Sequence, residues 1–408
     1  MSFKTLFYIC FGFLCLSFAF SCTNRPNFMK YDVVFYTQLG TNVNEVGSNI
    51  PFLEKLFSDS RTYLENDYID IPSNLKIFRN KMFLADKYNR RVSVFSLNSS
   101  GAVTNNPILS SGEGYSFGIP FQVVLTKYGE IYVLASYTNY YREPQIFTND
   151  EGMPYTGSVD APTNSRLYYI YKFSPDGEFL YQIGENGINS SPMAYPQRID
   201  VDLFDNIYIY FKDFDSDQNL WDVKRFSPSG ELNFEFSTKY LSPTNNIEDK
   251  VYVGRINDIY NLKNDERMMI FSENQIFARK GKNGTNEIVA TPDEYYNSID
   301  EYSVLQNAIT KNIYKTKKYL DQFINITKDD VLVLYAFEDK FNGVRFRFID
   351  FNSANNKQET YYAPILANRY LTCGYYVDDN GQIYTALVKE NSYFVLIRWK
   401  KVQSKNIL

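Results

Sequence analysis

Histidine is absent from this sequence of 408 residues. That absence excludes a Ser-His-Asp triad, histidine-ligated zinc and an imidazole general base. An excess of positive charge is also missing, because 42 lysines and arginines stand against 47 acidic residues. Nucleic-acid binding depends on clustered positive charge. We therefore expect no nucleic-acid partner and no histidine-based catalysis.

Cysteine is scarce, with four in the chain: Cys10, Cys15, Cys22 and Cys373. Two of them belong to the apolar N-terminal segment and Cys22 is expected to be acylated, as argued below, so Cys373 is left without an intrachain partner and a disulfide framework is excluded. We expect Cys373 to be a buried small hydrophobe, because no histidine is available to activate it as a nucleophile.

The N-terminus lacks a hydrophobic run long enough to cross a membrane, since residues 6–20 form an apolar stretch of only 15 residues. This length is typical of a signal peptide. The following Ala19-Phe20-Ser21-Cys22 resembles a bacterial lipobox of the relaxed kind found in spirochaetes. The resemblance implies removal of residues 1–21 and attachment of acyl chains such as palmitate to Cys22. The alternative is an ordinary cleaved signal with an unmodified Cys22.

If Cys22 is acylated, residues 22–30 form a polar tether and the protein is anchored to a bacterial membrane. We expect this to be the periplasmic face of the outer membrane.

Aromatic residues are plentiful, with 36 Tyr and 33 Phe, and these favour strands. The motif of residues 173–178 (FSPDGE) returns at residues 226–231 (FSPSGE), each copy lying between strand-like runs. A second kind of hairpin recurs with Ile131, Ile207 and Ile383 in equivalent positions. Two hairpins make a four-stranded antiparallel sheet, and its repetition along the chain is typical of propeller blades.

The repeats predict an all-β, six-bladed β-propeller over residues 31–402, followed by a short tail at 403–408. The predicted blades are 75–105, 122–184, 198–237, 256–300, 320–362 and 371–399. The last blade shows only three strands. Residues 34–39 resemble the outer strand of the second blade, so we expect them to close the ring as the missing strand. Two tandem β-sandwiches are the alternative.

Residues 82–95 resemble the core of an NHL repeat, in which a strand ends in Ala-Asp and an Asn-Arg turn follows. The second and third blades keep the glycine turns but lack these pairs. Many NHL propellers have six blades, and their Asp and Arg are largely structural. The resemblance therefore implies structural roles for Asp86, Asn89 and Arg90.

Long inserts are expected on one face of the disc, because alternate connections of a four-stranded blade leave from the same side. These inserts are 41–72, 138–165, 212–220 and 338–343. Long loops on rigid scaffolds commonly bind partners. We predict contact residues among the aromatics of the second blade's insert, namely Tyr140, Tyr141, Phe147 and Tyr155, with packing inside the insert as the alternative.

Alternating carboxylates at Asp213, Asp215 and Asp217 are spaced like calcium ligands, but Gln218 replaces the required glycine and Lys224 the bidentate glutamate. We therefore expect a solvated turn and no cofactor beyond the covalent lipid. Apolar spacing in residues 302–323 indicates an extra helix, whose lysines at 311, 315, 317 and 318 would form a solvated face, with a patch for anionic lipids as the alternative.

Three functions are compatible with these features. The first is a lipid-anchored scaffold that binds envelope proteins without doing chemistry, and fold analogy suggests a role in outer-membrane protein assembly. The second is a gluconolactonase-like hydrolase with a divalent ion in the central channel, although no ligand pattern recurs along the inner strands. The third is a sugar- or peptide-binding propeller. We expect a protein without enzymatic activity.

Overall fold

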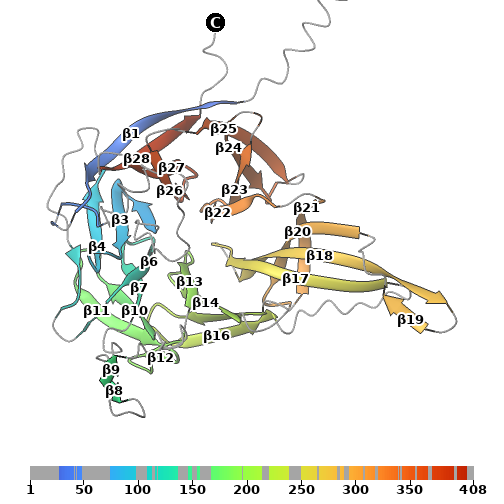
Figure 1. Ribbon diagram of the computed structural model, residues 1–408, viewed down its shortest axis with the longest axis horizontal. Coiled ribbons are helices and arrows are strands. Elements are labelled where there is room, and N and C mark those ends of the chain that lie inside the picture. Colours follow the sequence, from blue (N-terminus) through green and yellow to red (C-terminus); the bar gives the residue numbers. More distant parts are fainter. Residues whose placement is uncertain are drawn as a thin grey trace, which may run out of the picture.

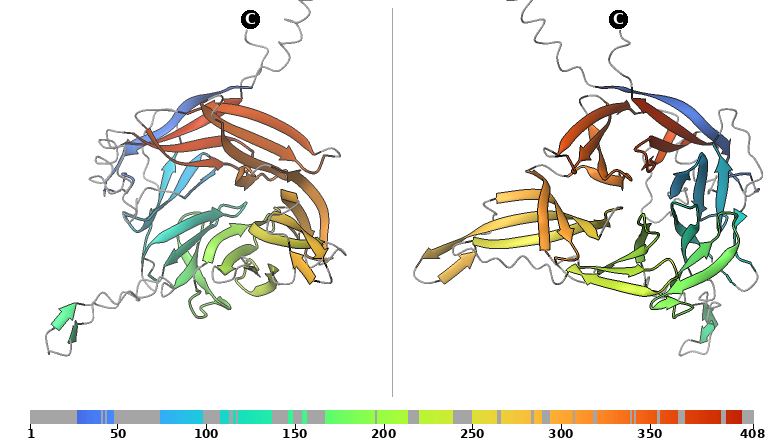
Figure 2. Two further views of the ribbon diagram at one scale, coloured as in Figure 1. Left: turned by 45° about the vertical axis from the view of Figure 1, so that its right-hand side comes forward. Right: turned by 180° about the vertical axis from the view of Figure 1, so that it is seen from behind.

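A computed structural model describes residues 27–401 apart from several stretches, the longest of which are 48–73, 98–107, 137–145, 149–153, 157–166, 214–219, 239–249 and 289–293. The described residues form strands and turns, with no α-helix among them. Six antiparallel sheets surround a central axis (Figure 1, Figure 2). The chain is a six-bladed β-propeller, and the alternative of two stacked sandwiches is excluded.

The first three blades follow the chain from the inner strand outward. Their strands are β2 (Leu75–Phe78), β3 (Lys81–Asp86), β4 (Arg91–Ser96) and β5 (Ile108–Leu109), then β6 (Pro120–Leu125), β7 (Ile131–Ser136), β10 (Tyr168–Phe173), β11 (Phe179–Gly184) and β12 (Gly187–Ile188), then β13 (Pro196–Val201), β14 (Ile207–Asp213), β15 (Leu220–Phe226) and β16 (Leu232–Ser237). Gly177 and Gly230, at φ +90° and +82°, close the two FSPxGE turns. The predicted glycine hairpins are confirmed.

The last three blades include a fourth blade that is longer than predicted. The strands are β17 (Lys250–Asn261), β18 (Arg267–Lys282), β19 (Thr285–Ile288), β20 (Glu294–Ser303) and β21 (Ala308–Thr316), then β22 (Gln322–Ile326), β23 (Val331–Glu338), β24 (Gly343–Asp350) and β25 (Lys357–Pro364), then β26 (Tyr370–Val377), β27 (Ile383–Lys389) and β28 (Tyr393–Lys401).

The predicted helix within residues 302–323 is wrong, because this region holds β21, which pairs with β20. Two register shifts interrupt the pairing. Ile313 is buried between the fourth and fifth blades, whereas Ile309, four residues earlier, is exposed. The helical spacing of the apolar residues therefore arose from an irregular strand. Of the lysines expected there, Lys311 bonds the Phe351 carbonyl, Lys315 and Lys317 are exposed, and position 318 lies outside the described residues.

The ring is closed by β1 (Met29–Gln38), which pairs with β28 as the outermost strand of the sixth blade. The predicted closing strand at 34–39 is confirmed, and the pairing begins earlier, at Met29. Residues 29 and 30, expected in the tether, thus belong to the sheet. The predicted signal peptide at 1–21 and tail at 403–408 lie outside the described residues.

The core consists of six apolar clusters, one between each pair of neighbouring blades. Because both faces of every blade pack against a neighbour, middle strands such as β7 are buried along their whole length and are apolar except at the terminal Ser136. Cys373 packs against the cluster between the sixth and first blades, and burial raises the pKa of its thiol to about 12. This environment agrees with an inert cysteine.

Candidate functional site

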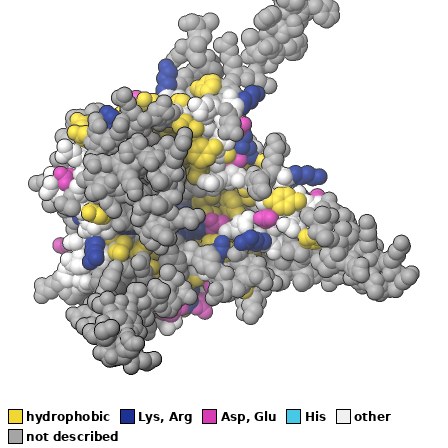
Figure 3. Space-filling model, in the orientation of Figure 1, with side chains coloured by type: hydrophobic (Ala, Val, Ile, Leu, Met, Phe, Trp, Pro, Cys, Tyr) yellow, Lys and Arg dark blue, Asp and Glu magenta, His cyan; other side chains and the backbone are white. Residues whose placement is uncertain are grey.

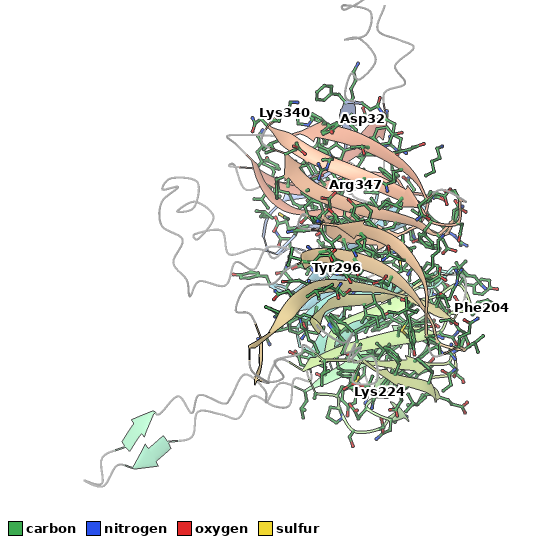
Figure 4. The ribbon with its side chains drawn as sticks, turned by 90° about the vertical axis from the view of Figure 1, so that its right-hand side faces the viewer. Asp32, Phe204, Lys224, Tyr296, Lys340 and Arg347 are labelled. Carbon is green, nitrogen blue, oxygen red and sulfur yellow. The ribbon has the colours of Figure 1, made fainter. Side chains whose placement is uncertain are left out.

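The two ends of the propeller differ in the strand connections that they carry. We call the end with the second-to-third strand connections the insert face and the opposite end the turn face. Figure 4 shows the hairpin of β8 (Ile146–Thr148) and β9 (Pro154–Thr156) on the same side as Lys340 of the β23–β24 connection, with Phe204 on the other side. The described parts of these two inserts therefore share a face, as predicted.

The predicted contact residues are only partly described. Phe147 lies opposite Tyr155 in the β8–β9 pairing, while positions 140 and 141 lie outside the described residues. Asp213 ends β14, opposite Leu220, and positions 215 and 217 lie outside the described part, as does position 22.

Sequence reasoning missed an extension of the fourth blade. The outer part of β18 pairs with β19 in a hairpin between the second and third strands of that blade. Asn283 and Gly284 separate these two strands in the sequence, and Asn-Gly between strand-like runs is a strong hairpin signal. This dipeptide could have revealed the extension.

The NHL-like residues hold the segment that follows the closing strand. Asp86 is fully buried and accepts hydrogen bonds from the backbone of Gly47 (3.1 Å) and Asn89 (3.2 Å). The Asn89 side chain donates to the Gly40 carbonyl at 3.0 Å. A Cβ atom on Gly47 would lie 2.3 Å from the Asp86 carboxylate, so only glycine permits this approach.

The arginine of this network is Arg91 and not the expected Arg90. Arg91 is buried, lies 3.5 Å from Asp86, and donates to the carbonyls of Asn42 (2.6 Å) and Glu45 (2.7 Å). Arg90 is exposed and occupies the left-handed turn position at φ +52°. The structural roles of Asp86 and Asn89 agree with the resemblance, and the role given to Arg90 is corrected.

The channel is lined by the inner strands β2, β6, β13, β17, β22 and β26, and side-chain amides join three of their junctions. Asn74 accepts from the Val123 backbone at 3.0 Å, and Asn325 donates to the Val377 carbonyl at 2.9 Å. Gln122 forms two bonds with the Ile199 backbone, at 2.8 and 2.9 Å. Each amide satisfies backbone groups that the free edge of an inner strand exposes.

Charged and aromatic side chains join the remaining junctions. Arg198 forms an ion pair with Asp258 at 2.5 Å, and its guanidinium lies 3.7 Å from the ring centroid of Tyr260. Burial opposes the charge of Arg198, but Asp258, Tyr260 and Tyr210 together outweigh it and the pKa of the guanidinium is raised. The ring of Tyr260 in turn stacks on Phe323 of the fifth blade, 3.6 Å between centroids.

At the turn face, paired charges join different blades. Lys76 contacts Asp379 at 3.2 Å across the sixth and first blades, and Lys263 contacts Asp200 at 2.5 Å. The cavity between these residues measures about 40 Å³, little more than the space of one water molecule. A substrate does not fit there. In the described residues, moreover, no group of three or more cysteines or acids could hold a metal ion.

A larger cavity of about 230 Å³ lies between the fifth and sixth blades. Its walls include Asp329 and Asn380 from two tight turns and Lys401 from the end of β28. The Lys401 ammonium lies 4.3 Å from the centroid of Phe348 and 3.6 Å from Glu359. This arrangement places polar groups beside the apolar ring of Phe348. No pattern in the sequence predicted it.

Comparison with known proteins gives distant likenesses only. No protein-family model matches the chain, and no curated protein matches it. Similar solved structures include the hydrazine synthase of Kuenenia stuttgartiensis (9% identity, TM-score 0.40, 81% of each chain), a polysaccharide lyase (10%, 0.41, 93% of this chain and 99% of that one) and a gluconolactonase from Xanthomonas campestris (11%, 0.34, 78% and 82%). At these TM-scores the likenesses transfer no activity.

Proposed function

We propose that this propeller is a binding scaffold of the bacterial envelope, held at a membrane by acylated Cys22, and that its insert face receives a protein partner. The observation that carries the proposal is the contrast between channel and insert face. The inner-strand side chains of Gln122, Arg198 and Lys76 bond neighbouring blades, whereas extra chain, including the β8–β9 hairpin, extends from one end of the disc.

The anchor is tested separately from the scaffold. Cys22→Ala is expected to abolish metabolic labelling with palmitate and to release the protein from membranes. In the described residues, no helix is long and apolar enough to span a bilayer. Unchanged membrane partitioning of the Cys22→Ala protein would contradict the anchor.

The scaffold is tested by crosslinking in intact cells followed by affinity capture. Replacing residues 138–165 by a short glycine-serine linker is expected to remove specific crosslinked envelope proteins. The matched control is Phe204→Ser, an exposed side chain on the turn face, which should leave the same set in place. Recovery of outer-membrane assembly proteins by the unmodified chain alone would support the finer role in that process.

Two other functions have distinct outcomes. A stoichiometric divalent ion together with lactone hydrolysis that a chelator abolishes would replace the scaffold by the hydrolase. Sugar or peptide binding is favoured by the cavity between the fifth and sixth blades, with its mixed polar and apolar lining. Saturation-transfer NMR with monosaccharides, repeated on Asn380→Trp, which fills the cavity, tests that function.

A further inference from the structure

Exposed apolar side chains gather on the closing strand and the residue before it. Phe28, Tyr31, Val33 and Tyr36 are 50%, 45%, 49% and 51% exposed, respectively. Single exposed apolar side chains are ordinary, but four within nine residues are the kind of grouping that marks an interaction surface. In Figure 3, hydrophobic side chains lie between lysine or arginine side chains at the upper edge, where β1 and β28 run in Figure 1.

A β-bulge places three of these side chains on one face. Tyr31, Val33 and Tyr36 lie opposite Trp399, Ile397 and Val395, all members of the cluster between the fifth and sixth blades. Phe35, after the bulge between Val33 and Phe35, instead enters the cluster between the sixth and first blades. Without the extra residue, Tyr36 would point to the other face. We call Tyr31, Val33 and Tyr36 the β1 stripe.

The chain just before β1 is fixed to the fifth blade. The Tyr362 backbone donates to the Asn27 carbonyl at 2.9 Å, and Phe28 forms a bridge with Tyr362. Asn27 follows Cys22 by five residues. Five extended residues reach at most about 18 Å. An acylated Cys22 in a bilayer would therefore hold this edge close to the lipid headgroups.

We propose that the β1 stripe lies against the membrane interface, so that the propeller stands on edge with both of its ends free. This inference rests on the proposed anchor. Tyrosine rings favour the headgroup region because they combine an apolar body with a polar tip. Lys30 and Lys400 are exposed and lie opposite each other on the other face of the same edge, where Lys400 pairs with Asp32 and Lys30 can approach anionic headgroups. Orientation on edge would also leave the insert face open to its partner.

The two tryptophans allow a direct test. The Trp399 ring lies 5.5 Å from that of Tyr31, whereas Trp221 belongs to the third blade. The acylated full-length mature protein is reconstituted in phosphatidylethanolamine–phosphatidylglycerol vesicles that contain a nitroxide-labelled phospholipid. In the Trp221→Phe protein, Trp399 is the remaining source of tryptophan fluorescence, and we expect the nitroxide to quench it. In the Trp399→Phe protein, the fluorescence comes from Trp221, and we expect the nitroxide to quench it little.

Substitutions then test the β1 stripe itself. Combined Tyr31→Ser, Val33→Ser and Tyr36→Ser in the Trp221→Phe protein should reduce quenching of Trp399 at least threefold, while the protein still floats with the vesicles through its acyl chains. The matched control is Tyr128→Ser with Phe204→Ser, two exposed aromatics on tight turns far from β1 along the ring. Circular dichroism verifies that each variant is folded.

The outcomes separate the two proposals. If the acylated protein floats but Trp399 is no more quenched than Trp221, the membrane-facing stripe is wrong and the anchor stands. If palmitate labelling is absent from the unmodified chain, the anchor and the stripe are both refuted. Quenching of Trp399 that the triple substitution leaves unchanged also overturns the assignment of these three side chains.

Discussion

At the scale of single residues, polar side chains in this propeller bond the backbone groups that a neighbouring strand bonds in an ordinary sheet. Inner strands have one edge without a neighbouring strand, and an unpaired buried backbone group is costly. Asn74, Gln122 and Asn325 bond these edges across three blade junctions. Their amides can both donate and accept, which suits a mixed edge of N–H and C=O groups.

Asp86 gives the first prediction. Asp86→Ala removes the acceptor of the Gly47 and Asn89 backbones and leaves the buried Arg91 without its carboxylate. We expect the free energy of unfolding to fall by about 3 kcal/mol or more. Urea unfolding followed by tyrosine fluorescence measures the change. The control Arg90→Ala alters an exposed side chain and should cost about 0.5 kcal/mol. Equal losses in the two variants would contradict the structural role of Asp86.

Asp379 gives a pH-dependent prediction. Burial alone would raise the pKa of Asp379, but the charges of Lys76 and Lys263 and the hydrogen bond from Lys76 lower it below its ordinary value. A carboxyl whose folded pKa is depressed stabilises the protein above its unfolded pKa, about 3.9, and loses this contribution as pH falls through the folded value. The stability difference between the unmodified protein and Asp379→Asn should therefore be constant from pH 7 to 5 and shrink below pH 4.

Urea unfolding at pH 7, 5, 4 and 3 measures this difference. Asp176→Asn, in an exposed turn, serves as the matched control. A difference that grows as the pH falls would reverse the sign of the Lys76–Asp379 interaction and refute its stabilising role.

Residue roles were only partly predictable from the sequence. The Asp86–Asn89 turn was predictable, because a short motif carried it. The choice between Arg90 and Arg91 was not, since it depends on which of two adjacent residues takes the left-handed turn position. The role of Gln122 was hidden for another reason, because its partner at Ile199 lies in the next blade.

At the scale of elements, β1 carries the closure, and one side chain tests it. Phe35 is 1% exposed in the cluster between the sixth and first blades and packs against Phe95, 4.9 Å between ring centroids. Phe35→Ala is expected to destabilise the protein by about 3–5 kcal/mol. The neighbouring Tyr36→Ala, which alters an exposed ring, should cost about 1 kcal/mol or less.

Urea unfolding of both variants measures these losses. The same fluorescence probe is used for each, so that the slopes with urea can be compared. A small loss for Phe35→Ala would mean that β1 adds little to the stability of the ring.

Elements with two-residue alternation or a glycine turn were predictable, and irregular ones were not. The hairpins around Gly177 and Gly230 follow from local turn chemistry. In β21, two register shifts disturb the alternation, and Ile309 and Ile313 of this strand, with Leu305 of the preceding turn, have a spacing that imitates a helix. Local periodicity could not reveal that β20 supplies the partner strand.

At the scale of the whole molecule, the six apolar clusters make a ring in which each blade is stabilised by two neighbours. Such a ring must be closed where the two ends of the chain meet, and we call this β1–β28 pairing the seam. The sequence predicted it because the last blade lacked a strand while residues 34–39 resembled one. What could not be predicted is that Asn27 and Phe28 continue past the sixth blade to the fifth. This overlap makes the seam span two blades.

A disulfide across the seam tests the register of the β1–β28 pairing. Lys30 lies opposite Lys400 in the β1–β28 pairing, and directly opposed residues of antiparallel strands have Cα separations that a disulfide accepts. Lys30→Cys with Lys400→Cys, in a Cys373→Ala background, would close a loop of more than 300 residues. The chain-entropy relation then gives a stabilisation of about 6 kcal/mol. The reduced form of the same protein is the matched control, because it carries identical substitutions. If the oxidised form is no more resistant to urea than the reduced form, the crosslink strains the native sheet and the Lys30–Lys400 register of the β1–β28 pairing is wrong.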